Sequence, residues 1–314
     1  MKTALLFPGQ GSQYVGMGKS LWEGFPEVRR LYQAATDLLG YDVERVCFEG
    51  PKQRLNTTLY TQPILFIVCV AVLRIFEKEV GESASFVAGH SLGEYAALVA
   101  AGSLAFEEGL MLVQKRATSM QESTPEGTGG MAAVMGLSAE AVEDICRESA
   151  GGQVLVLANY NAPGQIVLSG EEEPLARAIA LARERQGKAI RLPVSAPFHS
   201  PLMVPASERL AEVLGDVQFK DPRIPWVSNV TASAVDTADE FRRLLSLQVC
   251  SPVRWAASIR WMLDAGVTRF IELGPQKVLK GLCRRIDPGI RCDAAETLDE
   301  LKRLPGSAEP AGGE

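Results

Sequence analysis

The sequence predicts an α/β protein in which a parallel sheet, covered by helices on both faces, is interrupted by a smaller inserted subdomain. Short apolar runs alternate with segments of helical period over most of the 314 residues, which is typical of a parallel sheet with its crossover helices. Residues 130–193 instead follow the order strand, helix, strand, strand, helix, strand. A Gly-x-Ser-x-Gly segment at 89–93 directly follows one apolar run, which predicts a sharp strand-to-helix turn there.

The part of the chain before the insertion supplies the first elements of the sheet. Residues 3–7 and 85–89 are short apolar runs that end at Pro or Gly, which predicts strands. The spacing of apolar residues predicts helices at 27–39, 63–79, 92–101 and 106–121. The run at 123–130 is rich in Gly and Thr and predicts a linker into the insertion.

The insertion has its own pattern of short elements. Strands are predicted at 131–135, 154–158, 165–169 and 189–192, and helices at 138–148 and 171–186. Ser138 is the predicted N-cap of the first helix, and an Asn-Ala-Pro-Gly turn joins the two middle strands. The resulting β-α-β-β-α-β order predicts a ferredoxin-like arrangement.

After the insertion the chain returns to the larger unit. Strands are predicted at 222–227 and 268–273, and helices at 239–247 and 253–263. The predicted domains are a core formed by 1–125 and 196–303, a ferredoxin-like subdomain at 126–195, and a tail at 304–314. The tail is expected to be disordered because it has almost no apolar side chains to bury.

Composition indicates a water-soluble enzyme that resides in the cytoplasm. The chain is 46% hydrophobic and 22% charged, as in ordinary globular proteins, and its net charge of −6 argues against a nucleic-acid partner. The apolar stretch 64–73 is too short to span a bilayer, and the N-terminal apolar run is too short for a signal peptide. The six cysteines show no metal-ligand spacing and are expected to be reduced.

The Gly-x-Ser-x-Gly segment predicts a nucleophile elbow centred on Ser91. In such an elbow the serine hydroxyl is exposed at the top of the sheet, and the N-terminus of the following helix favours negative charge beside it. The alternative is a Gly-rich turn with an incidental serine, because the motif is common by chance. The preceding strand and the following helix pattern favour the elbow.

The small supply of histidines narrows the choice of a base for Ser91. A serine hydroxyl needs a base to take its proton, and the chain has two histidines, His90 and His199. The elbow should aim His90 away from the hydroxyl, which leaves His199. Prolines on both sides of His199 predict a loop with a fixed backbone. Because Ser91 precedes the insertion and His199 follows it, the site is expected in the cleft between the core and the subdomain.

Arg116 lies on the apolar stripe of the helix predicted at 106–121. Val113, Ala117 and Met120 share this face with it, so the guanidinium should point inward and must find an anion. No acid lies one turn away on that helix. A distant carboxylate and a ligand carboxylate both remain possible partners, since a guanidinium forms a bidentate fork with either.

The Gly-rich loop at 9–13 follows the first predicted strand directly. Such a loop can place a backbone N–H beside the elbow, and the residue after the nucleophile, Leu92, would supply a second N–H. Together these donors would form an oxyanion hole for a tetrahedral intermediate. A plain Gly-rich connection explains the loop equally well.

Five ordered segments closely resemble those of malonyl-CoA:acyl carrier protein transacylases. They lie at 7–13, 89–95, 114–116, 159–165 and 197–200, and the resemblance covers residues 3–285. It implies an α/β-hydrolase-like core with a parallel sheet and an inserted ferredoxin-like subdomain. It also implies transfer of a malonyl group from malonyl-CoA to acyl carrier protein, in fatty-acid biosynthesis, with no metal and no redox cofactor.

The resemblance assigns roles to individual residues. It implies that Ser91 carries the malonyl ester, that His199 is the general base and acid, and that Arg116 holds the malonyl carboxylate. The remaining roles are two oxyanion-hole amides from Gln10 and Leu92, a backbone carbonyl at Gln248 that orients the histidine, and two residues that line the substrate site, Asn161 and Phe198. A phenylalanine before the histidine accompanies preference for malonyl over methylmalonyl groups in this family.

Three other functions are open on the sequence alone. A serine esterase or lipase would share the elbow and add an acidic triad member, for which Glu171 lies in a suitable place between Ser91 and His199. A non-catalytic binding module would be expected to lack the serine, the base or the arginine, and all three are present. A discrete acyltransferase of a polyketide synthase would look the same as a fatty-acid enzyme.

The expected partner is an acyl carrier protein, which is typically acidic, and the chain is expected to be a monomer that binds no membrane. Since this chain is itself acidic, docking should need a local basic patch. Two clusters are candidates. The first is Arg183, Arg185, Lys188 and Arg191, and the second is Lys280, Arg284 and Arg285.

Overall fold

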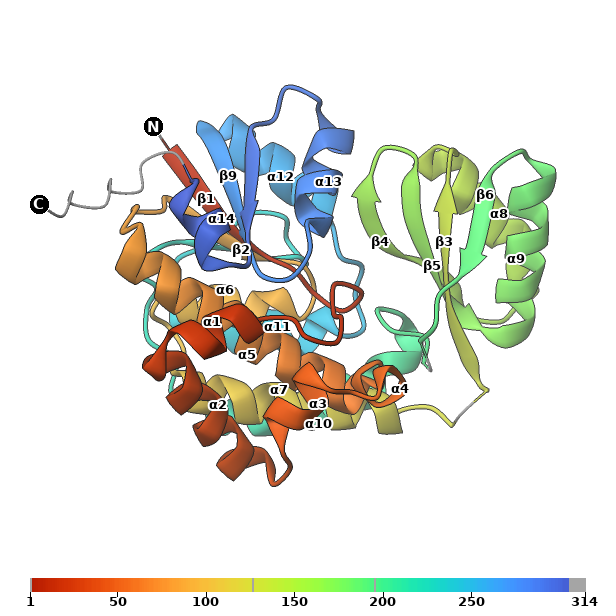
Figure 1. The fold of residues 1–314 in the computed structure, drawn as a ribbon. Helices are drawn as coiled ribbons and strands as arrows, with labels where there is room; N and C mark the ends of the chain where they lie inside the picture. The colour runs from red at the N-terminus through yellow and green to blue at the C-terminus, as the bar shows by residue number, and fades with distance from the viewer. Residues whose placement is uncertain (1, 126, 195, 305–314) are drawn as a thin grey trace, which may run out of the picture.

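A computed structural model describes residues 2–125, 127–194 and 196–304, which form two separate sheets, each packed against helices (Figure 1). Within these residues the larger sheet has six strands in the order β10-β9-β1-β2-β7-β8, all parallel except the last pair. The strands are β1 (Lys2–Phe7), β2 (Phe86–Gly89), β7 (Trp226–Val227), β8 (Ala234–Val235), β9 (Val267–Leu273) and β10 (Cys292–Ala295). The predicted α/β class with a parallel sheet is confirmed.

The alternation of side chains along β1 separates the two faces of this sheet. Ala4 and Leu6 join one buried cluster, whereas Leu5 and Phe7 join another, as the two-residue period of a strand requires. The first face is covered by α12 (Trp255–Asp264) and α13 (Val278–Ile286). The larger cluster lies on the opposite face, and these helices contribute buried residues to it: α1 (Lys19–Gly24), α2 (Pro26–Leu39), α3 (Val43–Phe48), α4 (Lys52–Leu55), α5 (Thr58–Glu79), α6 (Gly93–Ala100), α7 (Phe106–Glu122), α10 (Val204–Asp216), α11 (Ala238–Gln248) and α14 (Leu298–Lys302).

The smaller sheet belongs to the insertion and lies to one side of the core (Figure 1). Its antiparallel strands run in the order β4-β5-β3-β6, which is the ferredoxin-like order that the sequence predicts. The elements are β3 (Gly129–Met135), α8 (Ala139–Ala150), β4 (Leu155–Ala162), β5 (Gln165–Glu171), α9 (Glu172–Glu184) and β6 (Lys188–Arg191). The helices cover one face, and Met131 and Val167 on the other face join the cluster of the core.

Several sequence predictions of element limits are wrong. The strand expected at 222–227 is reduced to β7, and the short β8 and β10 were not predicted. The helices α1, α3, α4, α10, α13 and α14 and the 3-10 turn η1 (Pro201–Met203) were also missed. Most of these are one or two turns long, so each offers too few apolar positions to define a period. The buried residues of α10 recur every four positions in a single narrow row, Ala206, Leu210 and Leu214.

The long helix α5 begins at Thr58, five residues before the predicted start at Pro63. By length and composition it is the one helix in the described residues that could cross a membrane, because it extends beyond the apolar stretch 64–73 at both ends. However, 83% of its most apolar window is buried inside the protein, as expected for a central core helix. Pro63, which has no amide proton, lies inside this helix directly after Gln62. The side chain of Gln62 accepts a hydrogen bond from Arg116.

Some predictions concern residues outside the described ranges. The predicted domain limits at 126 and 195 fall on two such residues, and the predicted tail lies outside them from residue 305 onward. Leu304, the first residue of that tail, is buried against the core, so the tail prediction starts too early.

Candidate active site

The Gly-x-Ser-x-Gly segment forms a tight turn between β2 and α6. Ser91 has a φ of 52°, a left-handed conformation that non-glycine residues seldom adopt. A Cβ on Gly89 would lie 1.8 Å from the carbonyl carbon of Gly93, and a Cβ on Gly93 would lie 2.1 Å from the oxygen of Phe7. Both glycines are therefore required by close backbone approach, and the predicted elbow is present.

His199 lies in a loop directly opposite the serine, at a φ of 58°. Its Nε2 is 2.8 Å from Ser91 Oγ, and its Nδ1 is 2.8 Å from the carbonyl oxygen of Gln248 and 3.2 Å from that of Ser251. A carbonyl oxygen can only accept, so Nδ1 carries the proton and Nε2 presents its lone pair to the serine hydroxyl. This is the tautomer that a general base needs.

The acid that a hydrolase triad would require is not at this position. Glu171 accepts hydrogen bonds from the Val154 amide at 2.9 Å and from Gln153 Nε2 at 3.1 Å, within the subdomain. Backbone carbonyls hold the imidazole instead. The geometry therefore gives no support to a triad of Ser91, Glu171 and His199.

His90 points away from the nucleophile, as the elbow geometry predicts. Its Nε2 is 2.8 Å from Asn161 Oδ1, and its ring centroid lies 5.4 Å from that of Trp255. Burial lowers the pKa of His90. Asn161, predicted to line the site, thus connects strand β4 of the subdomain to the elbow of the core.

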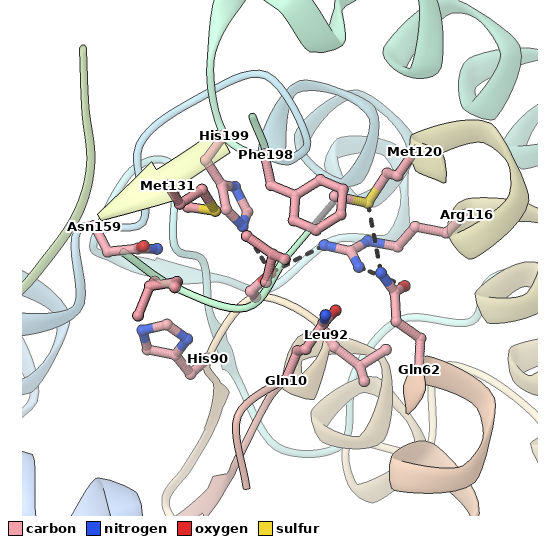
Figure 2. A pocket seen from close by; sticks show the side chains of 13 residues that line it. Gln10, Gln62, His90, Leu92, Arg116, Met120, Met131, Asn159, Phe198 and His199 are labelled. Carbon is pink, nitrogen blue, oxygen red and sulfur yellow. Dashed lines mark hydrogen bonds between the residues drawn. The ribbon is translucent and has the colours of Figure 1, made fainter. Parts of the chain in front are cut away.

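Arg116 is buried, with 1% of its surface exposed, and its guanidinium points toward Gln62 (Figure 2). Nη1 donates to Gln62 Oε1 at 2.6 Å, and Nη2 donates to Gln248 Oε1 at 2.8 Å and to Ser91 Oγ at 3.0 Å. Within residues 2–125, 127–194 and 196–304, no carboxylate oxygen forms an ion pair with it, and its Nε has no partner. A buried cation held only by neutral acceptors is strongly suited to an anionic ligand.

Gln10 and Leu92, whose backbone amides are the predicted oxyanion-hole donors, line the same cavity as Ser91. A Cβ on Gly9 would lie 2.3 Å from the oxygen of His90, so the loop after β1 is pressed against the turn. Among the described residues, neither amide donates a hydrogen bond within the protein. Free N–H groups beside a nucleophile are what an oxyanion hole needs.

These groups surround a cavity of about 90 Å³ at the junction of core and subdomain. Its lining, drawn in Figure 2, consists of Gln10, Gln62, His90, Ser91, Leu92, Arg116, Met120, Met131, Asn159, Leu192, Val194, Phe198 and His199. A neighbouring cavity of about 280 Å³ shares part of this lining and includes Asn161. The small cavity suits a short acyl group, and the shared lining residues place the wider cavity beside it.

Burial and a nearby positive charge favour the neutral form of the His199 imidazole. Burial, and secondly the nearby Arg116 guanidinium, lower the pKa of His199 to about 3. The imidazole is therefore in its basic form across the neutral range.

This shift predicts the pH dependence of acyl loading. Since kcat/KM reports the pKa values of the free enzyme, kcat/KM for malonyl-CoA is expected to stay flat between about pH 5 and 8, without the acid limb near pH 6.5 of an ordinary histidine. Steady-state rates across this range test the prediction. Malonyl-pantetheine, which lacks the phosphates of CoA, is the control substrate. An acid limb near pH 6.5 with both substrates would contradict the lowered pKa.

Sequence reasoning missed a set of buried polar residues behind the site. They are Gln62, Glu94 and Asn229, together with the side-chain amide of Gln248. The feature of the sequence that could have revealed such residues is a polar side chain within an apolar segment, such as Gln62 in the core helix α5. In the described residues, no group of three or more His, Cys, Asp or Glu side chains could hold a metal ion.

Comparison with known proteins identifies the family. The model of the acyl transferase domain matches residues 4–287. The malonyl CoA-acyl carrier protein transacylase of Bacillus subtilis (strain 168) is 46% identical over 303 residues, which cover 96% of this chain and 95% of that protein. The solved structure of the same enzyme from Coxiella burnetii is 41% identical, with a TM-score of 0.93 and 96% of each chain covered.

A second solved structure is a malonyl-transacylase in complex with a type II polyketide acyl-carrier protein. It is 40% identical, with a TM-score of 0.93, and the match covers 96% of this chain and 98% of that one. The sequence matches extend over both the core and the insertion, and with them over every segment that forms the site. The chain belongs to the acyl transferase family and, within it, to the malonyl CoA-acyl carrier protein transacylases.

Proposed function

We propose that this protein transfers a malonyl group from malonyl-CoA to the phosphopantetheine thiol of acyl carrier protein, through an ester on Ser91. The observation that carries the proposal is the buried Arg116 guanidinium, 3.0 Å from Ser91 Oγ and without a carboxylate partner among the described residues. An acyl group that ends in a carboxylate would supply the missing anion next to the nucleophile. An esterase for neutral substrates has no use for such a cation.

In the first half-reaction His199 Nε2 removes the proton from Ser91 Oγ while that oxygen attacks the thioester carbonyl. The Gln10 and Leu92 amides hold the oxyanion of the tetrahedral intermediate. When this intermediate collapses, the C–S bond breaks, and the CoA sulfur leaves with the proton from His199. The malonyl group remains on Ser91 as an ester, with its carboxylate against Arg116.

The second half-reaction reverses these roles. The carrier-protein thiol gives its proton to His199 Nε2 and attacks the Ser91 ester through the same oxyanion hole. Collapse breaks the bond to Ser91 Oγ, which recovers a proton from His199. Only acyl and proton transfers occur, so the proposed mechanism uses no metal and no redox cofactor.

The cavity geometry also suggests a basis for acyl-group choice. Phe198 lines the small cavity directly before His199 in the chain and is buried. Its ring would crowd a branch on the α-carbon of the acyl group, which supports a preference for malonyl over methylmalonyl groups.

We further propose the division into a core of 1–125 and 196–303 and a subdomain of 126–195. The two sheets, which lie on separate segments of the chain, support this division. A monomer located in the cytoplasm is proposed as well. In the described part of the chain one molecule supplies every side chain of the site, and the six cysteines are free thiols.

Intact-mass measurement tests the proposed function. Malonyl-CoA alone should add one malonyl group to the protein, peptide mapping should place it on Ser91, and addition of holo acyl carrier protein should remove it. Ser91→Ala should show neither adduct nor transfer. An adduct that maps to a cysteine, or that persists in the alanine variant, would refute the Ser91 ester.

The carrier protein itself is proposed to come from fatty-acid biosynthesis. A polyketide carrier protein is the second candidate, because the malonyl-transacylase of the solved complex is bound to one. Transfer rates from the malonyl-enzyme to each of the two carrier proteins would distinguish the pathways.

The two basic clusters that could bind this partner differ in how far their charges are already paired. In the first cluster, Arg185 pairs with Glu148 at 2.6 Å and Arg191 pairs with Glu172 at 2.5 Å. The second cluster, Lys280, Arg284 and Arg285, lies exposed on α13 and forms no ion pair with the described residues. The same helix lines the wider cavity through Val278, Leu279 and Leu282. We therefore favour the α13 cluster as the docking patch.

Charge reversal at this patch is expected to affect only the second half-reaction. Arg284→Glu should slow transfer to carrier protein by roughly tenfold at low salt, since steering by an attractive patch raises association rates by that order. Loading from malonyl-CoA should be unchanged. Arg185→Glu is the matched control in the other cluster. Equal losses in both half-reactions, or a larger effect of the control, would exclude the α13 cluster.

A further inference from the structure

Glu94 is a buried carboxyl group that the proposed mechanism does not use. It lies in the first turn of α6, three residues after the nucleophile, and it is completely inaccessible to solvent. It does not line the cavity and contacts neither Ser91 Oγ nor the His199 ring within hydrogen-bond distance. Burying a carboxylate costs free energy unless its oxygens are hydrogen-bonded, so the partners of Glu94 are informative.

Each carboxylate oxygen of Glu94 accepts one hydrogen bond from a distant segment. The backbone amide of Asn229 donates to Oε1 at 2.5 Å, and the side-chain Nε2 of Gln248 donates to Oε2. Burial raises the pKa of Glu94, while these two donors and the Arg116 guanidinium oppose the rise. The hydrogen bonds favour the ionised carboxylate, because an N–H donor faces each oxygen and no acceptor in the described residues is placed for a carboxyl proton.

The bond to Glu94 decides which way the Gln248 amide faces. Nε2 of Gln248 is held by Glu94 and also donates to the carbonyl oxygen of Ser91 at 2.8 Å. Its Oε1 must then face the other way, where it accepts from Arg116 Nη2 at 2.8 Å. A reversed amide would turn its own N–H groups toward the guanidinium, donor against donor.

A second set of hydrogen bonds connects Glu94 to the elbow through Asn229. Asn229, whose backbone amide Glu94 holds, accepts from the Ser91 amide at 2.7 Å and donates to the Gly89 oxygen at 2.7 Å. Glu94 therefore connects the turn that carries the nucleophile with the side chain that supports the guanidinium.

Resting on the proposed function, we propose that Glu94 is a positioning residue that orients Arg116 for the malonyl carboxylate through the amide of Gln248. The neutral Gln248 amide between Glu94 and Arg116 fixes where the guanidinium lies, and it leaves the positive charge of Arg116 without a directly paired carboxylate. A carboxylate in direct contact with Arg116 would pair with it and compete with the substrate. Glu94 thus contributes to the choice of acyl group without touching it.

The test is the ratio of kcat/KM for malonyl-CoA to kcat/KM for acetyl-CoA in the variant Glu94→Gln. The new amide has a single acceptor oxygen, so it cannot hold the Asn229 amide and Gln248 Nε2 at the same time, and the connection from the elbow to Arg116 is broken at one of the two donors. Malonyl loading should fall roughly 10- to 100-fold, by analogy with residues that orient metal ligands, mainly through KM. Acetyl loading should change much less, because acetyl has no carboxylate to meet Arg116.

Two comparisons make the result specific. Glu272→Gln removes another buried carboxylate, which accepts from the Leu279 and Lys280 amides, and it should leave the ratio unchanged. In an Arg116→Ala background, Glu94→Gln should cause no further loss of malonyl loading, since coupled residues are not additive.

Equal losses of malonyl and acetyl loading in Glu94→Gln would overturn the inference, as would full additivity with Arg116→Ala. If Glu94→Gln does not fold, Gln248→Met tests the same connection, and an unchanged ratio in that variant overturns it too. The proposed function fails separately, if Arg116→Ala itself lowers both substrates equally.

Discussion

Replacing His199 by alanine is expected to slow acyl transfer by roughly 10²- to 10⁴-fold, the usual range for loss of general acid–base help. His199 Nε2 is 2.8 Å from Ser91 Oγ, and the two carbonyl oxygens at Nδ1 fix its tautomer. Without this base the hydroxyl keeps its proton and attacks the thioester poorly. Both half-reactions should slow, because the same imidazole serves both. Single-turnover loading and transfer, each followed by intact mass, measure the two losses.

His90→Ala is the matched control for this prediction. His90 is adjacent to the nucleophile in the sequence, but its ring forms a hydrogen bond with Asn161 and lies tilted beside the Trp255 ring. Its removal should therefore leave considerably more activity than removal of His199. If a folded His90→Ala protein is as inactive as His199→Ala, the assignment of the base is wrong.

Replacing Arg116 by alanine is expected to cost malonyl loading about 2–5 kcal/mol, or roughly 30- to 4,000-fold in kcat/KM. The substitution removes one partner of a desolvated charge pair between the guanidinium and the malonyl carboxylate. Acetyl-CoA has no carboxylate, so its slow reaction should be retained or improved. Arg116→Lys should recover little, because an ammonium cannot form the two-pronged contact with a carboxylate. The measurement is kcat/KM for both substrates with the wild type and both variants.

An equal loss for malonyl-CoA and acetyl-CoA would show that Arg116 is structural. Its bonds to Gln62 and Gln248 offer such a role. Thermal unfolding of the variants serves as the control for stability. The proposed function would then lose the contact that distinguishes it from a generic esterase.

The sequence alone determined the fold class and the long elements. The helices α2, α7 and α8 have clear apolar stripes, and Ser138 caps α8 by accepting from the Ala141 amide, as predicted. The elbow could be predicted because Gly-x-Ser-x-Gly is a short local pattern that follows an apolar run, although the contact that requires Gly93 is with the distant Phe7 oxygen. The inserted β-α-β-β-α-β unit was recognisable because each of its elements is long enough to show a period.

The sequence also indicated which residues to bring together at the site. Ser91 and His199 followed from the chemistry of a nucleophile and the shortage of imidazoles, and Arg116 followed from a charge on an apolar helix face. The role of Leu92 followed from the elbow pattern as well as from the family resemblance, and the roles of Gln10 and Gln248 came from the resemblance. All six lie together in the structure, as the hydrogen bonds and the cavity lining place them.

Only the tertiary structure decided how the buried polar groups are paired. Glu94 reaches Asn229 and Gln248, and Gln248 reaches Ser91 across a sequence separation of 157 residues. Such partners carry no local period, because a hydrogen bond depends on where two side chains meet and not on their spacing in the chain. The same holds for the order of the short strands β7, β8 and β10 in the sheet. Local sequence fixes what each segment tends to form, whereas long-range packing fixes which donor finds which acceptor.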